Sequence, residues 1–327
     1  GSGTLANDAV AAQLALQGGR GLVLSNGEFG ERLVDHATRW RLCFDVYRAG
    51  WGEPFGIEEI AARRAAWIWM VHCETSTGML NDLAALRELC SRSGARLCVD
   101  AISSLGTVPI DLAHVAFATG VSGKGLGAYP GLALVLHERP APPARAIPRY
   151  LDLAAYQEPG EVPFTHSSNL MAALHAALAR VTAERYERIR ADGALLRTRL
   201  RERGFECVAP EPLASPAVLS IALPAKLSSR AVGEAMARLG YAIGYQSAYL
   251  VRRNWIQIAL MGAYSRHQLA DLAATLCEAA TYRPLEAALC AASGMTMSSV
   301  GVGTPAARAK ASGAISCAST SMGRPFR

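Results

Sequence analysis

Two residues of opposite charge stand where a buried sheet would bring them to one edge. Asp100 closes the apolar run 95–100, and Lys124 lies in the glycine-rich run 121–127. A lysine amine can hold an aldehyde cofactor as a Schiff base, and a carboxylate can keep a pyridine nitrogen protonated, so that the ring accepts electrons from a substrate carbanion. This pair predicts a pyridoxal 5'-phosphate site with Lys124 and Asp100 as its catalytic residues.

Each of these residues also has an ordinary interpretation. A single lysine in a glycine-rich turn is usually solvated, and Asp100 could simply cap the turn 101–104. The run 122–125 is similar to a nucleotide P-loop, but that loop needs Gly where Ala118 stands and Ser or Thr where Gly125 stands. We reject the nucleotide interpretation and keep the cofactor one, because both charges follow predicted strands.

The segments around these residues alternate between helix and strand. Helical spacing begins at Thr4 and recurs at 57–66 and 82–93. The predicted strands span 21–25, 67–72, 97–100, 115–119 and 132–136. Continuously apolar strands separated by helices predict an α/β fold, with a mostly parallel sheet sandwiched by helices and ligands bound beyond the carboxyl ends of the strands.

A smaller α+β lobe is predicted after a long helical stretch at 169–203. Its expected strands cover 205–208, 217–223, 241–244 and 255–260, and its expected helices cover 229–239 and 266–280. The last residues are rich in Ala, Ser, Gly and Thr, and burial cannot offset the cost of ordering such a segment. We therefore expect a cofactor-binding large domain at 1–185, a small C-terminal domain at 186–282 and a low-complexity, disordered tail at 283–327.

Composition narrows the function classes. The chain has 327 residues, 51% hydrophobic and 18% charged, which is typical of a soluble globular protein. Of the net charge of +6, four positive charges fall in 287–327, where no acid occurs. The folded part has no basic stripe with interleaved aromatic residues, so we expect no nucleic-acid partner.

The chain also lacks signals for a membrane or an oxidising compartment. No apolar run approaches the roughly 20 residues that span a bilayer, and the opening residues do not resemble a signal peptide. The eight cysteines never form a C-x-x-C pair. We expect reduced core thiols, no metal site, no membrane partner and a cytoplasmic location.

Three further motifs are compatible with a cofactor site, and each has a structural alternative. The run 1–4 precedes a helix, where free N–H groups favour a phosphate, although it could be a plain N-cap. Phe29 could stack on a pyridine ring or belong to the core. The hydroxyls of 72–78 could bond the cofactor's phenolic oxygen or form an ordinary Ser/Thr turn. Cys73 beside His72 is a poor nucleophile pair, because neighbours in a strand point to opposite faces.

Taken together, the ordered motifs resemble those of the class V aminotransferases of fold type I, particularly the alanine–glyoxylate and 2-aminoethylphosphonate–pyruvate transaminases. The likeness runs from Gly1 to about Ala280. The run 72–78 matches the family's H-x-E-[ST]-[ST]-T-G signature, and Asp100 with Ile102 matches its D-x-[VIM]-x-S motif. The resemblance implies that the cofactor is held by Ser2, Gly3, Thr4, Phe29, Thr75, Asp100, Ile102, Ser122, Lys124, Thr165 and Ser167.

The same resemblance implies a homodimer with a shared active site. In the family, a segment of the neighbouring subunit completes the phosphate site, and 164–167 resembles that segment here. Thr165 and Ser167 would supply its hydroxyls. Phe164 stands where tyrosine is common, so one phosphate hydrogen bond would be missing.

The chain departs from the family in two places. Family members bind the substrate anion with an arginine in the strand resembling 254–260, where this chain has Gln257. An amide cannot replace a bidentate guanidinium, so Arg252 or Arg253 is the candidate substitute unless the substrate lacks that anion. Family members also carry several dozen residues ahead of the phosphate loop, which predicts that the N-terminal part of the large domain is missing.

The expected function is transfer of an amino group from a small amine or amino acid, resembling 2-aminoethylphosphonate or alanine, to pyruvate or glyoxylate. Lys124 would carry the cofactor and then shuttle the substrate proton. A lyase or desulfurase on the same scaffold is one alternative, although no exposed cysteine loop follows Lys124. An inactive truncated paralogue is the other.

Overall fold

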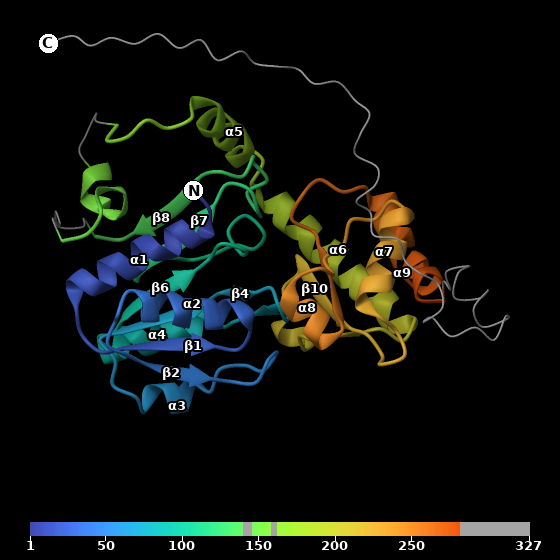
Figure 1. The fold of residues 1–327 in the computed structure, drawn as a ribbon, viewed down its shortest axis with the longest axis horizontal. Coiled ribbons are helices and arrows are strands. Elements are labelled where there is room, and N and C mark those ends of the chain that lie inside the picture. The colour runs from blue at the N-terminus through green and yellow to red at the C-terminus, as the bar shows by residue number, and fades with distance from the viewer. Residues whose placement is uncertain (140–145, 158–161, 282–327) are drawn as a thin grey trace, which may run out of the picture. The chain divides into compact units, whose positions relative to one another are not determined.

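The computed structural model describes residues 1–139, 146–157 and 162–281 (Figure 1). The predicted disordered tail at 283–327 lies outside these residues. Within them, no helix is both long enough and apolar enough to cross a membrane.

A six-stranded sheet forms the larger part of the fold. Its strands in chain order are β1 (Gly21–Ser25), β2 (Phe44–Arg48), β3 (Trp67–Val71), β6 (Arg96–Asp100), β7 (Val115–Val121) and β8 (Ala133–His137). They lie side by side in the order β2-β1-β3-β6-β7-β8, and all neighbours are parallel except β8, which runs antiparallel to β7. The predicted mostly parallel sheet is therefore confirmed.

Alternate side chains of these strands enter two separate cores. Trp67 and Trp69 of β3 are fully buried against α1 (Gly3–Gln17) and α2 (Glu28–Arg39) on one face. Ile68 and Met70 pack on the other face against the helices α3 (Ile57–Ala61) and α4 (Leu83–Ser93). Burial on both faces explains why the strands are continuously apolar, since each large side chain contributes about 1.5–3 kcal/mol when buried.

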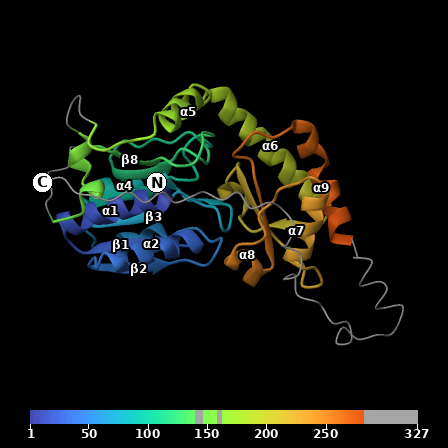
Figure 2. The same ribbon diagram turned by 45° about the horizontal axis from the view of Figure 1, so that its top comes forward.

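A three-stranded antiparallel sheet forms the smaller part, in the order β11-β10-β9. Its elements are β9 (Glu206–Cys207), β10 (Val218–Ala222) and β11 (Trp255–Ala259), with α6 (Ala183–Glu202), α7 (Ser229–Arg238), α8 (Ala248–Arg253) and α9 (Arg266–Thr281) (Figure 2). Leu219, Ile221 and Ile256 of the sheet share one core with α6, α7 and α9. The predicted α+β composition is confirmed, whereas the domain boundary at 185/186 stays a prediction.

Two predicted elements are wrong. The expected strand at 241–244 does not form, because the Tyr241 N–H closes the end of α7 by donating to the Met236 carbonyl, and only Gly244 makes an isolated bridge with Gln257. The expected helix at 169–203 is two helices, α5 (Ser168–Leu178) and α6. Thr182 adopts an extended backbone between them and accepts from the Arg185 N–H as an N-cap.

Several short elements were not predicted. They are α2, α8, the edge strand β2 and the hairpin of β4 (Cys73–Glu74) with β5 (Met79–Leu80), and 3-10 turns also occur at Arg149–Leu151, Leu153–Tyr156 and Glu211–Leu213. The six described cysteines are free thiols, but Cys43 is exposed, so the prediction that they belong to the core is wrong for that residue.

Candidate active site

Asp100 is the last residue of β6, and its carboxylate is buried at the edge of the sheet. Asn7 of α1 donates to Asp100 Oδ2 at 2.9 Å, and the Ile102 N–H donates to Oδ1 at 3.0 Å. Thr119 in turn donates to Asn7 Oδ1 at 2.9 Å, which fixes the amide orientation. Burial raises the pKa of Asp100, while the Asn7 and Ile102 donors oppose that rise. Asp100 therefore caps the turn at Ile102 with Oδ1, and Asn7 of α1 holds its Oδ2.

Lys124 follows β7 in a tight loop. Its Nζ donates to Ser103 Oγ at 3.0 Å. The loop is fastened by Arg185 Nη2, which donates to the Gly125 carbonyl at 2.6 Å, and by Gly127, whose φ of 73° favours glycine. Burial lowers the pKa of the Lys124 amine, and the charge of Asp100 partly offsets this. A lowered pKa increases the fraction of uncharged, nucleophilic amine.

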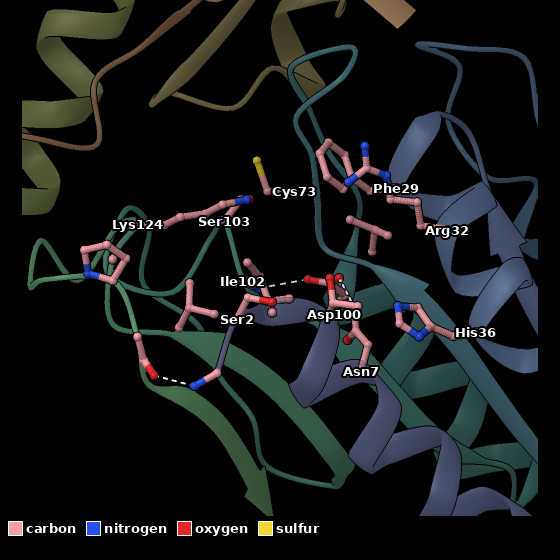
Figure 3. Close-up of a pocket in the computed structure, with 18 residues that line it drawn as sticks. Ser2, Asn7, Phe29, Arg32, His36, Cys73, Asp100, Ile102, Ser103 and Lys124 are labelled. Atoms are coloured by element: carbon pink, nitrogen blue, oxygen red, sulfur yellow. Dashed lines mark hydrogen bonds between the residues drawn. The ribbon is translucent and has the colours of Figure 1, made fainter. Parts of the chain in front are cut away.

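Both side chains line one cavity of about 620 Å³. In Figure 3 the Lys124 side chain extends into it from one side, Phe29 and Arg32 lie opposite, and Asp100 and Ile102 lie below. The remaining lining residues are Gly1, Ser2, Gly3, Thr4, Asn7, His36, Val71, Cys73, Ser103, Val121, Gly123, Pro130 and Gly131.

The first turn of α1 forms another wall of the cavity. Ser2 is its N-cap residue, but no side-chain hydrogen bond caps the helix. A Cβ atom at Gly3 would meet the end of the Ile102 side chain, so a larger residue at position 3 would have to displace Ile102 from the cavity wall. Ser2, Gly3 and Thr4 thus place a helix N-terminus, with its partial positive charge, at the cavity.

Phe29 reaches the cavity from the first turn of α2. Lys124 Nζ lies 5.4 Å from the centre of its ring. The N–H groups of Phe29 and Gly30 donate to Glu74 Oε2 at 3.0 and 2.9 Å, and the other oxygen of Glu74 accepts from Ser76. Burial raises the pKa of Glu74 to about 7. Glu74, the acidic residue of the 72–78 motif, therefore anchors α2, the helix that carries Phe29.

Comparison with known proteins identifies the family. A family model described as Aminotransferase class-V matches residues 44–139. The 2-aminoethylphosphonate–pyruvate transaminase of Pseudomonas entomophila is 31% identical over 243 residues, covering 68% of this chain and 66% of that relative. An aspartate aminotransferase structure from Thermus thermophilus is 32% identical with a TM-score of 0.77, covering 85% of this chain and 82% of that one. The chain belongs to the class V aminotransferase family.

A second solved structure agrees. The alanine–glyoxylate aminotransferase from Nostoc sp. is 28% identical with a TM-score of 0.77, covering 85% of this chain and 80% of that one. The resemblance to the class V aminotransferases and the fold type I architecture are confirmed, and the chain spans about two thirds of the length of the curated relatives it matches.

Two of the predicted cofactor ligands of this class V aminotransferase lie outside the cavity lining. Thr75 is buried, and its carbonyl accepts from Ser220 Oγ at 3.0 Å and from Gln257 Nε2. Ser122 Oγ donates to the Tyr129 carbonyl at 2.7 Å and accepts from the backbone of the same loop. Their side chains contribute to the packing around the site, and their contact with the cofactor stays a prediction.

The residues predicted to come from a neighbouring subunit also lie away from the lining. Thr165 and Ser167 are exposed, and Ser167 Oγ accepts from the Leu170 N–H as the N-cap of α5. Phe164 packs on Tyr150, with ring centres 5.0 Å apart. Their role in the partner's site stays a prediction.

The three predicted substrate residues do not line the cavity either. Gln257 Nε2 donates to the Thr75 carbonyl and to Ser220 Oγ. The Arg253 guanidinium lies 3.7 Å from the centre of the Trp51 ring. Arg252 approaches Glu28 at 3.9 Å and is otherwise exposed.

Sequence reasoning missed all the other polar side chains that line the site, namely Asn7, Arg32, His36, Cys73 and Ser103. A signal for two of them was present, because Phe29, Arg32 and His36 share one face of α2 at helical spacing. Cys73 stays a thiol, since burial raises its pKa to about 12, which agrees with the rejection of a cysteine nucleophile.

Proposed function

We propose that this class V aminotransferase transfers an amino group from a small amine or amino acid to pyruvate or glyoxylate. The observation that carries the proposal is that the Lys124 amine and the Asp100 carboxylate line one cavity at the edge of the sheet. The relatives support the reaction class, because their names specify pyruvate or glyoxylate as acceptors.

The residues present fit pyridoxal 5'-phosphate. A buried carboxylate suits a protonated pyridine nitrogen, and the two apolar side chains Phe29 and Ile102 suit the faces of a flat ring. The uncapped first turn of α1, with Ser2, Gly3 and Thr4, suits the phosphate. When bound, the cofactor supplies an electron sink for the substrate carbanion.

The chain's own residues would then perform the proton chemistry. Lys124 Nζ, with its pKa lowered by burial, would take the proton from the substrate carbon and deliver it to the cofactor's aldehyde carbon. The Ser103 hydroxyl holds the amine in place. Asp100 keeps a proton on the ring nitrogen, and Asn7 keeps the carboxylate directed at the cavity.

The finer predictions belong to the same proposal. We infer a homodimer in the cytoplasm, with Thr165 and Ser167 of one subunit near the phosphate of the other. No described observation favours the desulfurase alternative: Cys207 and Cys277, the described cysteines after Lys124, are partly buried rather than exposed.

The proposal is tested by borohydride reduction of the purified protein after incubation with pyridoxal 5'-phosphate. We expect visible absorbance that borohydride abolishes, and a mass adduct that maps to Lys124. Half-reactions with alanine and 2-aminoethylphosphonate should then bleach the absorbance, and pyruvate or glyoxylate should restore it. A colourless protein, or an adduct on another lysine, would contradict the proposal and favour an inactive paralogue, whereas release of ammonia or sulfide would favour the lyase.

A further inference from the structure

A transaminase that accepts 2-oxo acids must bind a carboxylate beside the reacting carbon. The family's usual arginine is replaced by Gln257, whose amide donates to Thr75 and Ser220. Arg253 lies between the rings of Trp51 and Trp255, at 3.7 and 5.0 Å from their centres. These residues leave the carboxylate without a cationic partner.

We propose that Arg32 of α2 supplies this partner and binds the carboxylate attached to the reacting carbon of the amino acid or 2-oxo acid. This inference deepens the proposed function and rests on it. Among the described residues that line the cavity, Arg32 is the one arginine. A planar guanidinium matches a carboxylate with two parallel hydrogen bonds.

Arg32 and Lys124 both lie close to the ring of Phe29 in the cavity. Its Cζ lies 4.7 Å from the centre of the Phe29 ring, and Lys124 Nζ lies 5.4 Å from the same centre. The positive charge of Arg32 also contributes to lowering the pKa of Lys124, so the two cations are electrostatically coupled. Figure 3 shows the Lys124 and Arg32 side chains on opposite sides of the cavity, so a small substrate bound between them would meet Lys124 with its reacting carbon and Arg32 with its carboxylate.

The guanidinium is available for such a ligand. About half of the Arg32 side chain (55%) is exposed, and its ion pair with Glu28 is long, at 3.4 Å. Glu28 is also approached by Arg252 at 3.9 Å, so two cations share one carboxylate. An exposed pair of this kind contributes at most about 1 kcal/mol, and a substrate carboxylate can displace it. Glu28 is thus a weak competitor for the anion.

Kinetics with charged and uncharged acceptors test the assignment. Arg32→Gln should raise KM for pyruvate about 10- to 100-fold, the range expected for lost hydrogen bonds to a charged group. It should leave KM for acetaldehyde, which lacks the carboxylate, within about twofold. The KM of Arg32→Lys for pyruvate should fall between those of the wild type and Arg32→Gln, because a lysine keeps the positive charge but loses the two parallel hydrogen bonds of the guanidinium. Glu28→Gln should lower KM for pyruvate two- to threefold.

A binding measurement that needs no turnover accompanies the kinetics. Saturation-transfer NMR should detect propionate, an unreactive carboxylate, on the wild-type protein and not on Arg32→Gln. The matched control is Arg39→Gln, on the same helix, because Arg39 is exposed, pairs with Asp35 at 2.7 Å and does not line the cavity. It should bind propionate as the wild type does.

The outcomes separate this inference from the proposed function. If Lys124 forms its borohydride adduct in both proteins but Arg32→Gln changes neither KM for pyruvate nor propionate binding, the Arg32 assignment is wrong and the transaminase proposal stands. An equal loss with pyruvate and acetaldehyde would also overturn it, since that result indicates a structural role. A wild-type protein without the Lys124 adduct contradicts the proposed function itself, and propionate binding then tests Arg32 independently.

Discussion

The two ends of the cavity are built in different ways. At the inner end, Asp100 is buried and Lys124 is half-buried, and each makes a hydrogen bond of 3.0 Å or less with a side chain from another segment. At the outer end, Arg32 is a long, exposed side chain that meets Glu28 at 3.4 Å, and Arg252, which lies outside the cavity lining, approaches the same Glu28 at 3.9 Å. The inner end is fixed by strand ends and packed helices, whereas the outer end depends on flexible side chains and weak ion pairs.

This difference separates the chemistry from the choice of substrate. A buried acid and a half-buried amine must be satisfied by fixed partners, since an unpaired charge out of contact with water is costly. Exposed arginines carry no such constraint, because water solvates them. We therefore expect substitutions at the inner end to abolish the reaction, and substitutions at the outer end to change which substrate is used. The relatives, whose names specify different amino compounds, are consistent with this expectation.

The largest effect is expected for Lys124→Ala, which removes both the cofactor's anchor and the proton carrier. Activity should fall by about 10⁴-fold or more, and the borohydride adduct should disappear, as measured by initial rates and intact mass. Lys226→Ala, at an exposed position, is the matched control. If Lys124→Ala kept more than a tenth of the rate, the inner end would not be the reacting end.

Asp100→Asn comes next, because it keeps the shape of the side chain and removes its charge. Breaking a buried ion pair costs about 3–5 kcal/mol, so kcat should fall roughly 10²- to 10³-fold while the Lys124 adduct still forms. Asp111→Asn, at an exposed acid that pairs with Arg87, should leave kcat unchanged. A normal kcat in Asp100→Asn would show that the carboxylate only caps the turn at Ile102 and takes no part in the reaction.

Glu74 connects the two ends by anchoring α2, and it should affect stability rather than chemistry. Folding raises its pKa from 4.5 to about 7, so the folded state binds more protons between these values. The free energy of unfolding that Glu74 contributes is fully present below pH 4.5 and is lost as the pH rises through 7. Glu74→Gln stays neutral and should abolish this loss.

Urea unfolding at several pH values between 4.5 and 8 measures the effect. The wild type should lose stability relative to Glu74→Gln as the pH rises, and most of the difference should be reached by pH 8. Glu88→Gln, at an exposed acid of α4, provides the control and should follow the wild type. Parallel curves for wild type and Glu74→Gln would contradict the raised pKa.

The inner end was predictable from sequence because its residues follow continuously apolar strands. β1 forms over Gly21–Ser25 as predicted, and β3 and β6 each differ by one residue at one end. Once these strands are parallel neighbours, the positions after them must lie at one edge of the sheet. That topological constraint places Asp100 and the lysine loop together without any knowledge of side-chain packing.

The outer end was not predictable by the same reasoning. The edge strand β2 is half exposed, and its mixed composition gave no strand signal. Helical spacing places Arg32 on the same face of α2 as Phe29, but that spacing does not show which face meets the cavity, because only the tertiary packing of α2 brings Arg32 there. Gln257 lies in a correctly predicted strand, but the hydrogen bonds of its side chain with Thr75 and Ser220 depend on three segments distant in the chain.

The smallest effect is expected for Gln257→Arg, which restores the family's usual residue. The Gln257 side chain opposes the rise that burial causes in the pKa of Tyr249, whose ring centre lies 6.5 Å from that of Phe29, so we expect a longer side chain at 257 to extend toward the substrate. We expect KM for pyruvate to fall two- to fivefold, and use of dicarboxylate or phosphonate substrates to improve. In the Arg32→Gln background the same substitution should recover part of the lost affinity, because either guanidinium can meet the carboxylate. No change of KM in either background would show that strand β11 does not face the substrate. Helix α2 would then be the element that binds the carboxylate at the outer end.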